Sequence, residues 1–204
     1  MIFSLKGKLT KKSPVLVNLS LIAGLSEVEF EIHIPVSTYE KLPECGNEVR
    51  LYIYPYFYKG EALLYGFISE EDRTMFRELL KLPGVGPGLA LRVLSGTTAE
   101  ELLKAVSEGN LDLLASIRGI GRRRAERIAF ELGGKIPSLR EKIREGSKAE
   151  ESREKALEAL LALGLKEKEA KEALKRASKK IEEGAPLEEI IKTALSRKAE
   201  NEDN

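Results

Sequence analysis

The residue types on which cross-linking, metal binding and much catalysis depend are scarce in this sequence. Its 204 residues include one cysteine, one histidine and no tryptophan. Cys45 alone cannot form an internal disulfide, and one cysteine with His33 is too small a set for a structural zinc site. Histidine-based triads and thiol chemistry have equally little material. We therefore interpret Cys45 and His33 as ordinary domain residues and expect no metal and no cofactor.

Long apolar runs and an excess of one charge are also missing. No apolar run approaches the roughly 18 residues that a membrane span needs, and the first residues lack the apolar core of a secretory signal. We therefore expect a cytoplasmic protein with no membrane partner. The formal net charge is +1, so any nucleic-acid site has to be a local basic patch. Hydrophobic residues make up 42% of the chain, which is enough for folded cores.

The first 67 residues have the pattern of β-strands. Alternating, β-branched or aromatic runs cover residues 15–22, 28–35 and 49–57. Turn-forming residues separate them: Gly24, residues 43–46 and residues 59–60. Several short strands in so small a region favour a closed or nearly closed barrel such as an OB-fold. A generic small barrel or sandwich without a binding role is the alternative.

Helical periodicity replaces the strand pattern after residue 67. Ser69 is placed to begin one helix, and Thr98 with Glu101 predicts a capping box at the start of another. Pro137 and Gly146 lie in a charged stretch with few apolar residues, which we interpret as a linker that can be partly helical. We predict an α+β multidomain protein with a barrel, a central helical domain, a linker and a three-helix module: residues 1–67, 68–134, 135–151 and 152–204.

The central domain contains an internal repeat. Residues 79–93 align with residues 114–128 at an offset of 35 residues, and the Gly-apolar-Gly sequences at Gly84 and Gly119 coincide. This is the helix-hairpin-helix pattern. Its glycines allow a sharp turn and a close approach to phosphate, and its second helix presents N–H groups and a positive dipole end to the anion. Such a site binds phosphate rather than base sequence. One copy could be a simple αα corner, but two matching copies favour DNA binding.

Arginine is concentrated in the second copy, where Glu126 is the only acidic residue among five arginines, Arg124 included. Each phosphate neutralised on duplex DNA adds about 0.9 to the salt dependence of binding. Val85 and Ile120 are expected to anchor the turns in the core. The candidate DNA-binding residues are the two turns and the cations beside them: Lys81, Gly84, Val85, Gly86, Gly88, Arg118, Gly119, Ile120, Gly121, Arg122, Arg123 and Arg127.

A catalytic function is not supported. The sequence lacks a phosphate-binding loop of the Gly-x-x-x-x-Gly-Lys-[Ser/Thr] type and a clustered aspartate motif for two-metal cleavage. Two functions for such a DNA-binding chain stay open: an accessory subunit of a repair nuclease, and a general duplex binder. Metal-dependent cleavage would identify the first, and equal binding to all DNA structures the second.

The order of these parts resembles the RuvA family over nearly the whole chain. The matching motifs are Leu63-Leu-Tyr-Gly-Phe67, Leu82 to Leu91, Gly119 to Arg127 and Ala159 to Leu165. The resemblance implies a non-catalytic subunit, tetrameric or octameric, that holds a four-way Holliday junction open in recombination and repair. It also implies recruitment of the hexameric ATPase motor RuvB by the third domain, with a junction resolvase as a further partner. The implied motor-binding residues are Leu160, Leu163, Leu165 and Leu195, with a role in the module's own core as the alternative for the first and last.

Two departures from the family pattern affect the site. The family usually has a lysine where this chain has Gly88, so the first hairpin is left with its backbone and with Lys81 or Arg92. The family's acidic pair, which forms a pin at the junction centre, is replaced by Lys59 and Gly60, with Glu61 adjacent. Lys59 and Glu61 are the candidates for the pin at the junction centre, but we do not assign them the role that the acidic pair has in the family.

Overall fold

The computed structural model describes residues 3–23 and 26–196. The chain divides into two compact units, Met1–Ile143 and Arg144–Asn204. One long helix, α7 (Ile136–Ala162), contributes to both. In the described ranges, no helix is both long enough and apolar enough to cross a membrane.

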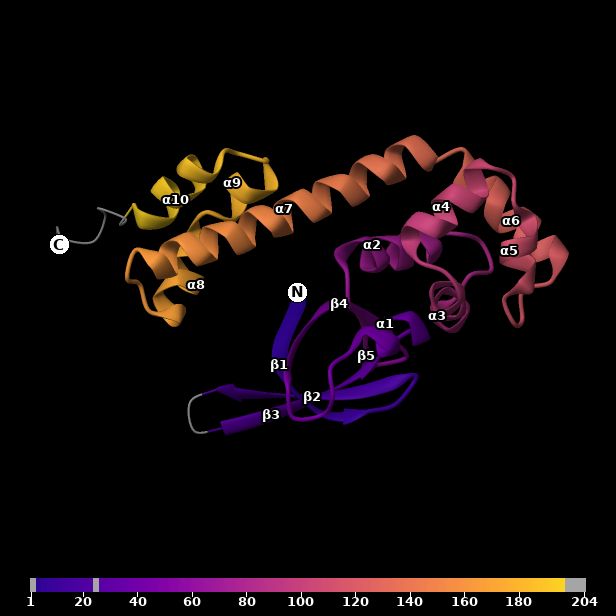
Figure 1. Ribbon diagram of the computed structural model, residues 1–204. Helices are drawn as coiled ribbons and strands as arrows, with labels where there is room; N and C mark the ends of the chain where they lie inside the picture. Colours follow the sequence, from indigo (N-terminus) through magenta and orange to yellow (C-terminus); the bar gives the residue numbers. More distant parts are fainter. Residues whose placement is uncertain (1–2, 24–25, 197–204) are drawn as a thin grey trace. The chain divides into compact units, whose positions relative to one another are not determined.

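A closed barrel forms the first part of the first unit (Figure 1). Its strands follow one another in the order β1-β2-β3-β5-β4, and all pair antiparallel except β3 with β5. Every second side chain of β1 is buried in its first half, as expected for a strand with one face in a core. The strands are β1 (Ser4–Lys12), β2 (Leu16–Ala23), β3 (Ser26–His33), β4 (Glu48–Tyr58) and β5 (Glu61–Phe67). The predicted barrel is therefore confirmed, and the three predicted runs correspond to β2, β3 and β4.

A short helix, α1 (Val36–Lys41), interrupts the strands, which sequence analysis did not predict. Its residues include β-branched types, but tertiary contacts decide their conformation. Thr38 is fully buried and accepts a hydrogen bond from the backbone N–H of Ile68 at 3.3 Å. Ser37 donates a hydrogen bond to the carbonyl of Leu94, in the helical part of the same unit. The predicted turn at Gly24 lies outside the described residues.

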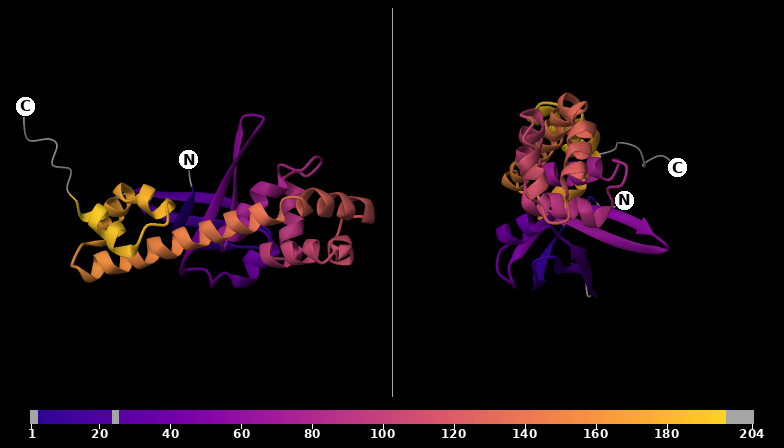
Figure 2. Two further views of the ribbon diagram at one scale, coloured as in Figure 1. Left: turned by 90° about the horizontal axis from the view of Figure 1, so that it is seen from above. Right: turned by 90° about the vertical axis from the view of Figure 1, so that its right-hand side faces the viewer.

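The β4–β5 hairpin extends from the barrel as a two-stranded ribbon (Figure 2). Tyr58 pairs with Glu61 at its end, so Lys59 and Gly60 form a two-residue turn. Both turn residues have positive φ, 49° and 86°, as in the type I′ turns that suit the twist of a hairpin. The predicted chain reversal at residues 59–60 is confirmed.

Five helices continue the first unit, and the start signals that the sequence predicted for two of them are confirmed. The Ser69 side chain accepts a hydrogen bond from the N–H of Asp72, and Thr98 with Glu101 forms both bonds of a capping box. The end of β5 and all five helices share one hydrophobic core, in which Phe67 and Phe76 are fully buried with ring centroids 5.0 Å apart. The helices are α2 (Glu70–Leu79), α3 (Pro87–Gly96), α4 (Ala99–Ser107), α5 (Leu111–Ser116) and α6 (Arg122–Gly133).

The stretch interpreted as a linker is helical from Ile136 onward, as part of α7. Pro137 is compatible with this because it lies in the first turn, where its missing N–H has no helical partner to lose. Leu139 is 1% exposed and packs in the core of the first unit with Ile136 and Ile143, a contribution that sequence analysis did not recognise. The boundary between the two units falls after Ile143, within the interval 135–151. The limits of the four predicted parts remain predictions.

The second unit is helical. It contains the C-terminal part of α7 with α8 (Glu167–Arg176), α9 (Ser178–Glu182) and α10 (Leu187–Leu195). Small and aliphatic side chains fill its core, among them Ala156, Leu160, Ala173 and Ile190. The second helix predicted here is in fact two, because the chain leaves helical geometry at Ala177, where φ is −91° and ψ is 4°.

Candidate nucleic-acid interface

The two hairpins of the sequence repeat have the same backbone geometry. In the first, the N–H of Val85 donates to the carbonyl of Leu82 at 3.1 Å. In the second, the N–H of Ile120 donates to the carbonyl of Ile117 at 2.9 Å. Val85 and Ile120 are buried in the shared core, as the sequence predicted. Each turn is thus closed by one hydrogen bond and anchored by one apolar side chain.

The glycines of each hairpin fall into two kinds. Gly84 and Gly119 have φ values of 78° and 85°, a left-handed conformation that side chains disfavour. Gly86 and Gly121 have ordinary φ values of −94° and −77°, and a Cβ added to either would meet nothing within 4 Å. The fold therefore requires glycine at the first position of each pair and not at the second.

The second helix of each hairpin begins directly after the turn. Gly86 is the N-cap of α3 and Gly121 is the N-cap of α6, and neither has a side chain that could cap the first turn. N–H groups in a first helical turn have no partner within the helix, and the helix dipole makes this end positive. Both hairpins consequently offer backbone donors to an external anion.

The arginines of the second hairpin have different surroundings. Arg122 lies 3.4 Å from Glu126 and 3.8 Å from Asp112, so part of its charge is compensated within the protein. Arg123 and Arg127 are exposed and take part in no ion pair in the part of the chain that the structure describes. Arg118 is exposed beside the same turn. Arg123 and Arg127 thus have charge available for an external anion.

Arg124 has a structural role that the sequence did not reveal. Its Nη1 donates a hydrogen bond to the carbonyl oxygen of Gly119 at 3.1 Å, so this side chain holds the second turn from outside. The spacing of five residues between donor and acceptor is the only sequence signal for it, and it is a weak one.

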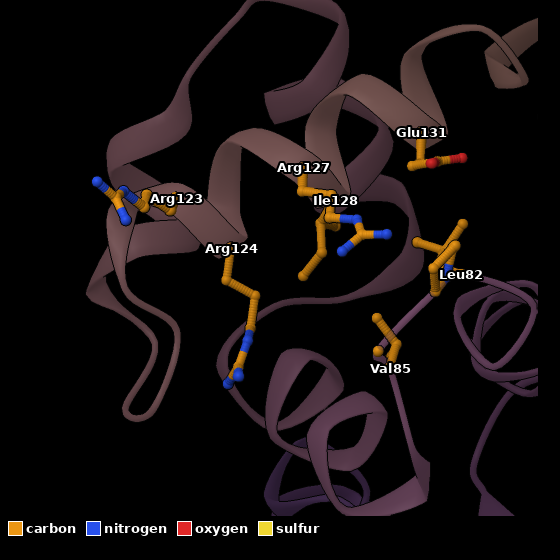
Figure 3. A pocket seen from close by; sticks show the side chains of 9 residues that line it. Leu82, Val85, Arg123, Arg124, Arg127, Ile128 and Glu131 are labelled. Carbon is orange, nitrogen blue, oxygen red and sulfur yellow. The ribbon is translucent and has the colours of Figure 1, made fainter.

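The first hairpin and α6 line one hollow of about 260 Å³ (Figure 3). Arg127 reaches from α6 toward Leu82 and Val85 on the opposite side. The lining residues are Leu82, Pro83, Gly84, Val85, Arg123, Arg124, Arg127, Ile128 and Glu131. The fold thus brings the turn of the first hairpin and the arginines of the second to one basic surface.

Lys81, a candidate DNA contact, is paired within the protein. Its Nζ lies 2.7 Å from Oε1 of Glu78, and Lys142 approaches the same oxygen at 3.4 Å. Burial raises the pKa of Glu78, but the hydrogen bonds and charges of Lys81 and Lys142 outweigh it, and the pKa is lower than usual. Gly88 is exposed in the first turn of α3 and supplies no charge.

The leucines expected to contact a motor do not all lie on the surface. Leu160 is fully buried in the core of the second unit, which removes it from the expected patch. Leu163 and Leu195 are 61% and 43% exposed, and Leu165 is half-buried against the core. Sequence analysis missed two further exposed leucines, whose helical spacing resembles that of core residues: Leu161 and Leu187.

The end of the β4–β5 hairpin has no acidic pair. Lys59 and Glu61 are exposed, and the Nζ of Lys59 lies 5.3 Å from the centre of the Tyr58 ring. Phe57 and Tyr58 are exposed on the same ribbon. This position therefore has one lysine, one glutamate and two exposed aromatic rings in place of an acidic pair.

His33 and Cys45 belong to the barrel part of the sequence and not to the two hairpins. The ring of His33 is 5.5 Å from that of Tyr65, and Cys45 is exposed in a turn. Among the described residues, no three side chains of the metal-binding types are grouped closely enough to hold an ion.

A closed OB-type barrel followed by two hairpins of equivalent backbone geometry defines a tandem helix-hairpin-helix protein. Family models agree with this class: the SAM-like helix-hairpin-helix tandem matches residues 76–133, the RuvA N-terminal domain residues 1–66, and the RuvA C-terminal domain residues 152–197. The chain belongs to the RuvA family.

Curated relatives match over nearly their whole length. Proteins named Holliday junction branch migration complex subunit RuvA are 34% identical in Syntrophus aciditrophicus, 37% in Burkholderia cenocepacia and 35% in Neisseria gonorrhoeae. Each alignment covers 96% of this chain, and 98%, 97% and 100% of the respective relative.

Proposed function

We propose that this chain binds four-way junction DNA through its two hairpins and, without catalysing a reaction itself, recruits a hexameric ATP-driven motor for branch migration. The names of its relatives support this, since they are subunits of a Holliday junction branch migration complex. The observation in the structure that carries the proposal is the presence of glycine at positions 86 and 121, where the fold does not require it.

A close ligand explains these two glycines. Their φ values are open to any residue, and the space around their Cβ positions is empty. Glycine in the N-cap position is also not needed for capping, because serine, threonine, asparagine or aspartate would cap better. A phosphate that approaches the backbone at the start of α3 and α6 would exclude a side chain at both positions.

The proposed contacts combine this backbone with side-chain charge. The turns at Gly84–Gly88 and Gly119–Gly121 would donate N–H groups, while Arg118, Arg123 and Arg127 would neutralise phosphates. Arg122 would contribute less because Glu126 and Asp112 already oppose its charge. Such contacts recognise the DNA backbone, so selectivity for a junction would come from the arrangement of several hairpins.

The test replaces each of these glycines by alanine. Gly86→Ala and Gly121→Ala should keep the fold, since neither Cβ meets another atom, with a slightly lower thermal unfolding midpoint because alanine is a poorer N-cap than glycine. Each should weaken junction binding by about tenfold, the equivalent of one hydrogen bond to a charged group. Gly134→Ala, at another open position in the same unit, is the matched control. Wild-type affinity in both hairpin variants would refute the proposed close approach.

A comparison of DNA structures separates this function from its alternatives. In EDTA, the protein should bind a synthetic four-way junction more tightly than a duplex of the same sequence. Equal affinities would support a general duplex binder. Cleavage of either DNA after Mg²⁺ is added would support an accessory nuclease function.

The assembly and the motor contact belong to the same proposal. We infer a homotetramer, with an octamer as the alternative, that acts in the cytoplasm and has a junction resolvase as a further partner. The resemblance to the RuvA family supports these inferences. Leu163, Leu165 and Leu195 are the proposed motor contacts, in a partner-binding domain that begins near residue 152. Light scattering of the purified chain, alone and with a junction, would measure the oligomeric state.

A further inference from the structure

Arg92 of α3 lies between the two hairpins. A Cβ built on Gly88, at the start of the same helix, would lie 3.9 Å from Nη1 of Arg92. A Cβ built on Gly119, in the turn of the second hairpin, would lie 3.4 Å from its Nε. The guanidinium group of Arg92 is therefore close to the first turn of α3 and to the turn of the second hairpin at once.

The packing of α3 fixes this position. Residues 88, 92 and 96 are spaced by four and lie on one face of the helix. On this face, a Cβ built on Gly96 would lie 3.0 Å from Cγ1 of Ile117, which precedes the second turn. Because position 96 has no side chain, α3 can lie close to the second hairpin. Arg92 lies one helical turn before Gly96, on the side of the first hairpin.

The charge of Arg92 is available to a ligand. Arg92 is exposed and forms no ion pair among the residues that the structure describes, in contrast to Lys81. A second guanidinium, that of Arg124, is bonded to the carbonyl of Gly119 on the same turn and also has no acidic partner there. Two arginines beside one turn, neither paired with a carboxylate among the described residues, form a site for an anion, and the planar guanidinium suits phosphate oxygens.

We propose that Arg92 binds a backbone phosphate of DNA from a position shared by both hairpins, and supplies the cation that the first hairpin lacks at Gly88. This inference rests on the proposed function. It distinguishes between the two cations available to the first hairpin: Lys81 is held by Glu78, whereas Arg92 has no acidic partner in the described part of the chain.

The decisive experiment measures the salt dependence of junction binding for Arg92→Ala. The slope of log K against log salt should be smaller than that of the wild type by about 0.9, the value for one lost phosphate contact. Lys175→Ala removes from the second unit one exposed charge that has no partner among residues 3–23 and 26–196, and should leave the slope unchanged. An unchanged slope for Arg92→Ala, with normal binding by the wild type, would overturn the role of Arg92 and leave the proposed function standing. A wild-type protein that fails to bind DNA would overturn both.

Two further variants test the shared position. Gly88→Lys in the Arg92→Ala background places a cation on the same face of α3, one turn earlier, where there is room for a side chain. It should restore the slope, and failure to do so would overturn the sharing between hairpins. Arg92→Lys should keep the wild-type slope but bind more weakly, because lysine keeps the charge and loses the two-pronged geometry. Equal thermal unfolding midpoints in all variants would show that the fold is retained.

Discussion

The Nζ of Lys81 lies 2.7 Å from Oε1 of Glu78, a carboxylate whose side chain is only 6% exposed. The sequence places Lys81 beside the first hairpin as a candidate phosphate contact, but the fold gives it a partner three residues earlier on the chain. Arg123, by contrast, is exposed at the second hairpin and unpaired in the described part of the chain.

Lys81→Ala and Arg123→Ala should therefore differ in DNA binding. Arg123→Ala should reduce the salt slope of junction binding by about 0.9. Lys81→Ala should reduce it less, because the free protein already neutralises this charge at Glu78. Filter-binding titrations at four salt concentrations would measure both. Equal reductions would mean that Lys81 leaves Glu78 when DNA binds.

The stability of the first unit should depend on pH through Glu78. Its pKa is lower than the ordinary 4.5 because Lys81 and Lys142 outweigh the effect of burial. A lowered carboxyl pKa stabilises the fold above the ordinary value, and this stabilisation is lost as the pH falls through the lower folded value. Urea unfolding should show a stability difference between wild type and Glu78→Gln that is full near pH 7 and shrinks below pH 4.5. The exposed Glu40→Gln is the control, and a difference independent of pH would contradict the role of these charges.

Asp72 should be required for the contact between α2 and the start of α4. Its Oδ1 accepts a hydrogen bond from the backbone N–H of Ala99 at 2.9 Å, and both residues are buried. Asp72→Ala leaves this N–H without a partner and should lower the free energy of unfolding by about 1–3 kcal/mol. Ser69→Ala removes the cap of α2 and a side-chain hydrogen bond to the Asp72 carboxyl but keeps the bond from Asp72 to Ala99, and should cost about 1 kcal/mol. A loss for Asp72→Ala no larger than for Ser69→Ala would argue against the long-range bond.

Two leucines of the second unit should have opposite phenotypes. Leu160→Ala leaves a cavity in the core and should lower the free energy of unfolding by about 2–5 kcal/mol. Leu163→Ala should change it by less than about 0.5 kcal/mol, because the side chain is 61% exposed, but should reduce stimulation of the motor ATPase. Calorimetry and an ATPase assay with the motor and junction DNA would measure the two effects. Normal stimulation by Leu163→Ala would remove this residue from the proposed contact.

Features encoded by neighbouring residues could be predicted from the sequence. The positive φ of Gly84 and Gly119, the cap at Ser69 and the capping box at Thr98 all depend on residues within about four positions of one another. For the same reason, the 35-residue repeat was enough to predict two equivalent hairpins. The predicted closed barrel also followed from short alternating strands, without knowledge of their pairing.

Features that depend on distant residues could not be predicted. The helix α1 forms where strand-type residues are held by contacts with Ile68 and Leu94. The burial of Leu160, which the sequence left open between core and motor contact, results from the packing of α8 and α10 against α7. Helical periodicity identifies a residue as apolar and repeated but does not say which side of the helix meets a neighbour.

The sequence by itself determined the order of the parts, the two phosphate-type hairpins and the membership of a family, because these reside in local motifs and their succession along the chain. Only the tertiary structure decided which cations remain unpaired, that Arg92 lies beside Gly119, and that the first hairpin and α6 share one basic hollow. The physical reason is that charge pairing and close approach depend on distances of a few ångströms, which packing sets both for residues far apart in the chain and for close ones such as Lys81 and Glu78.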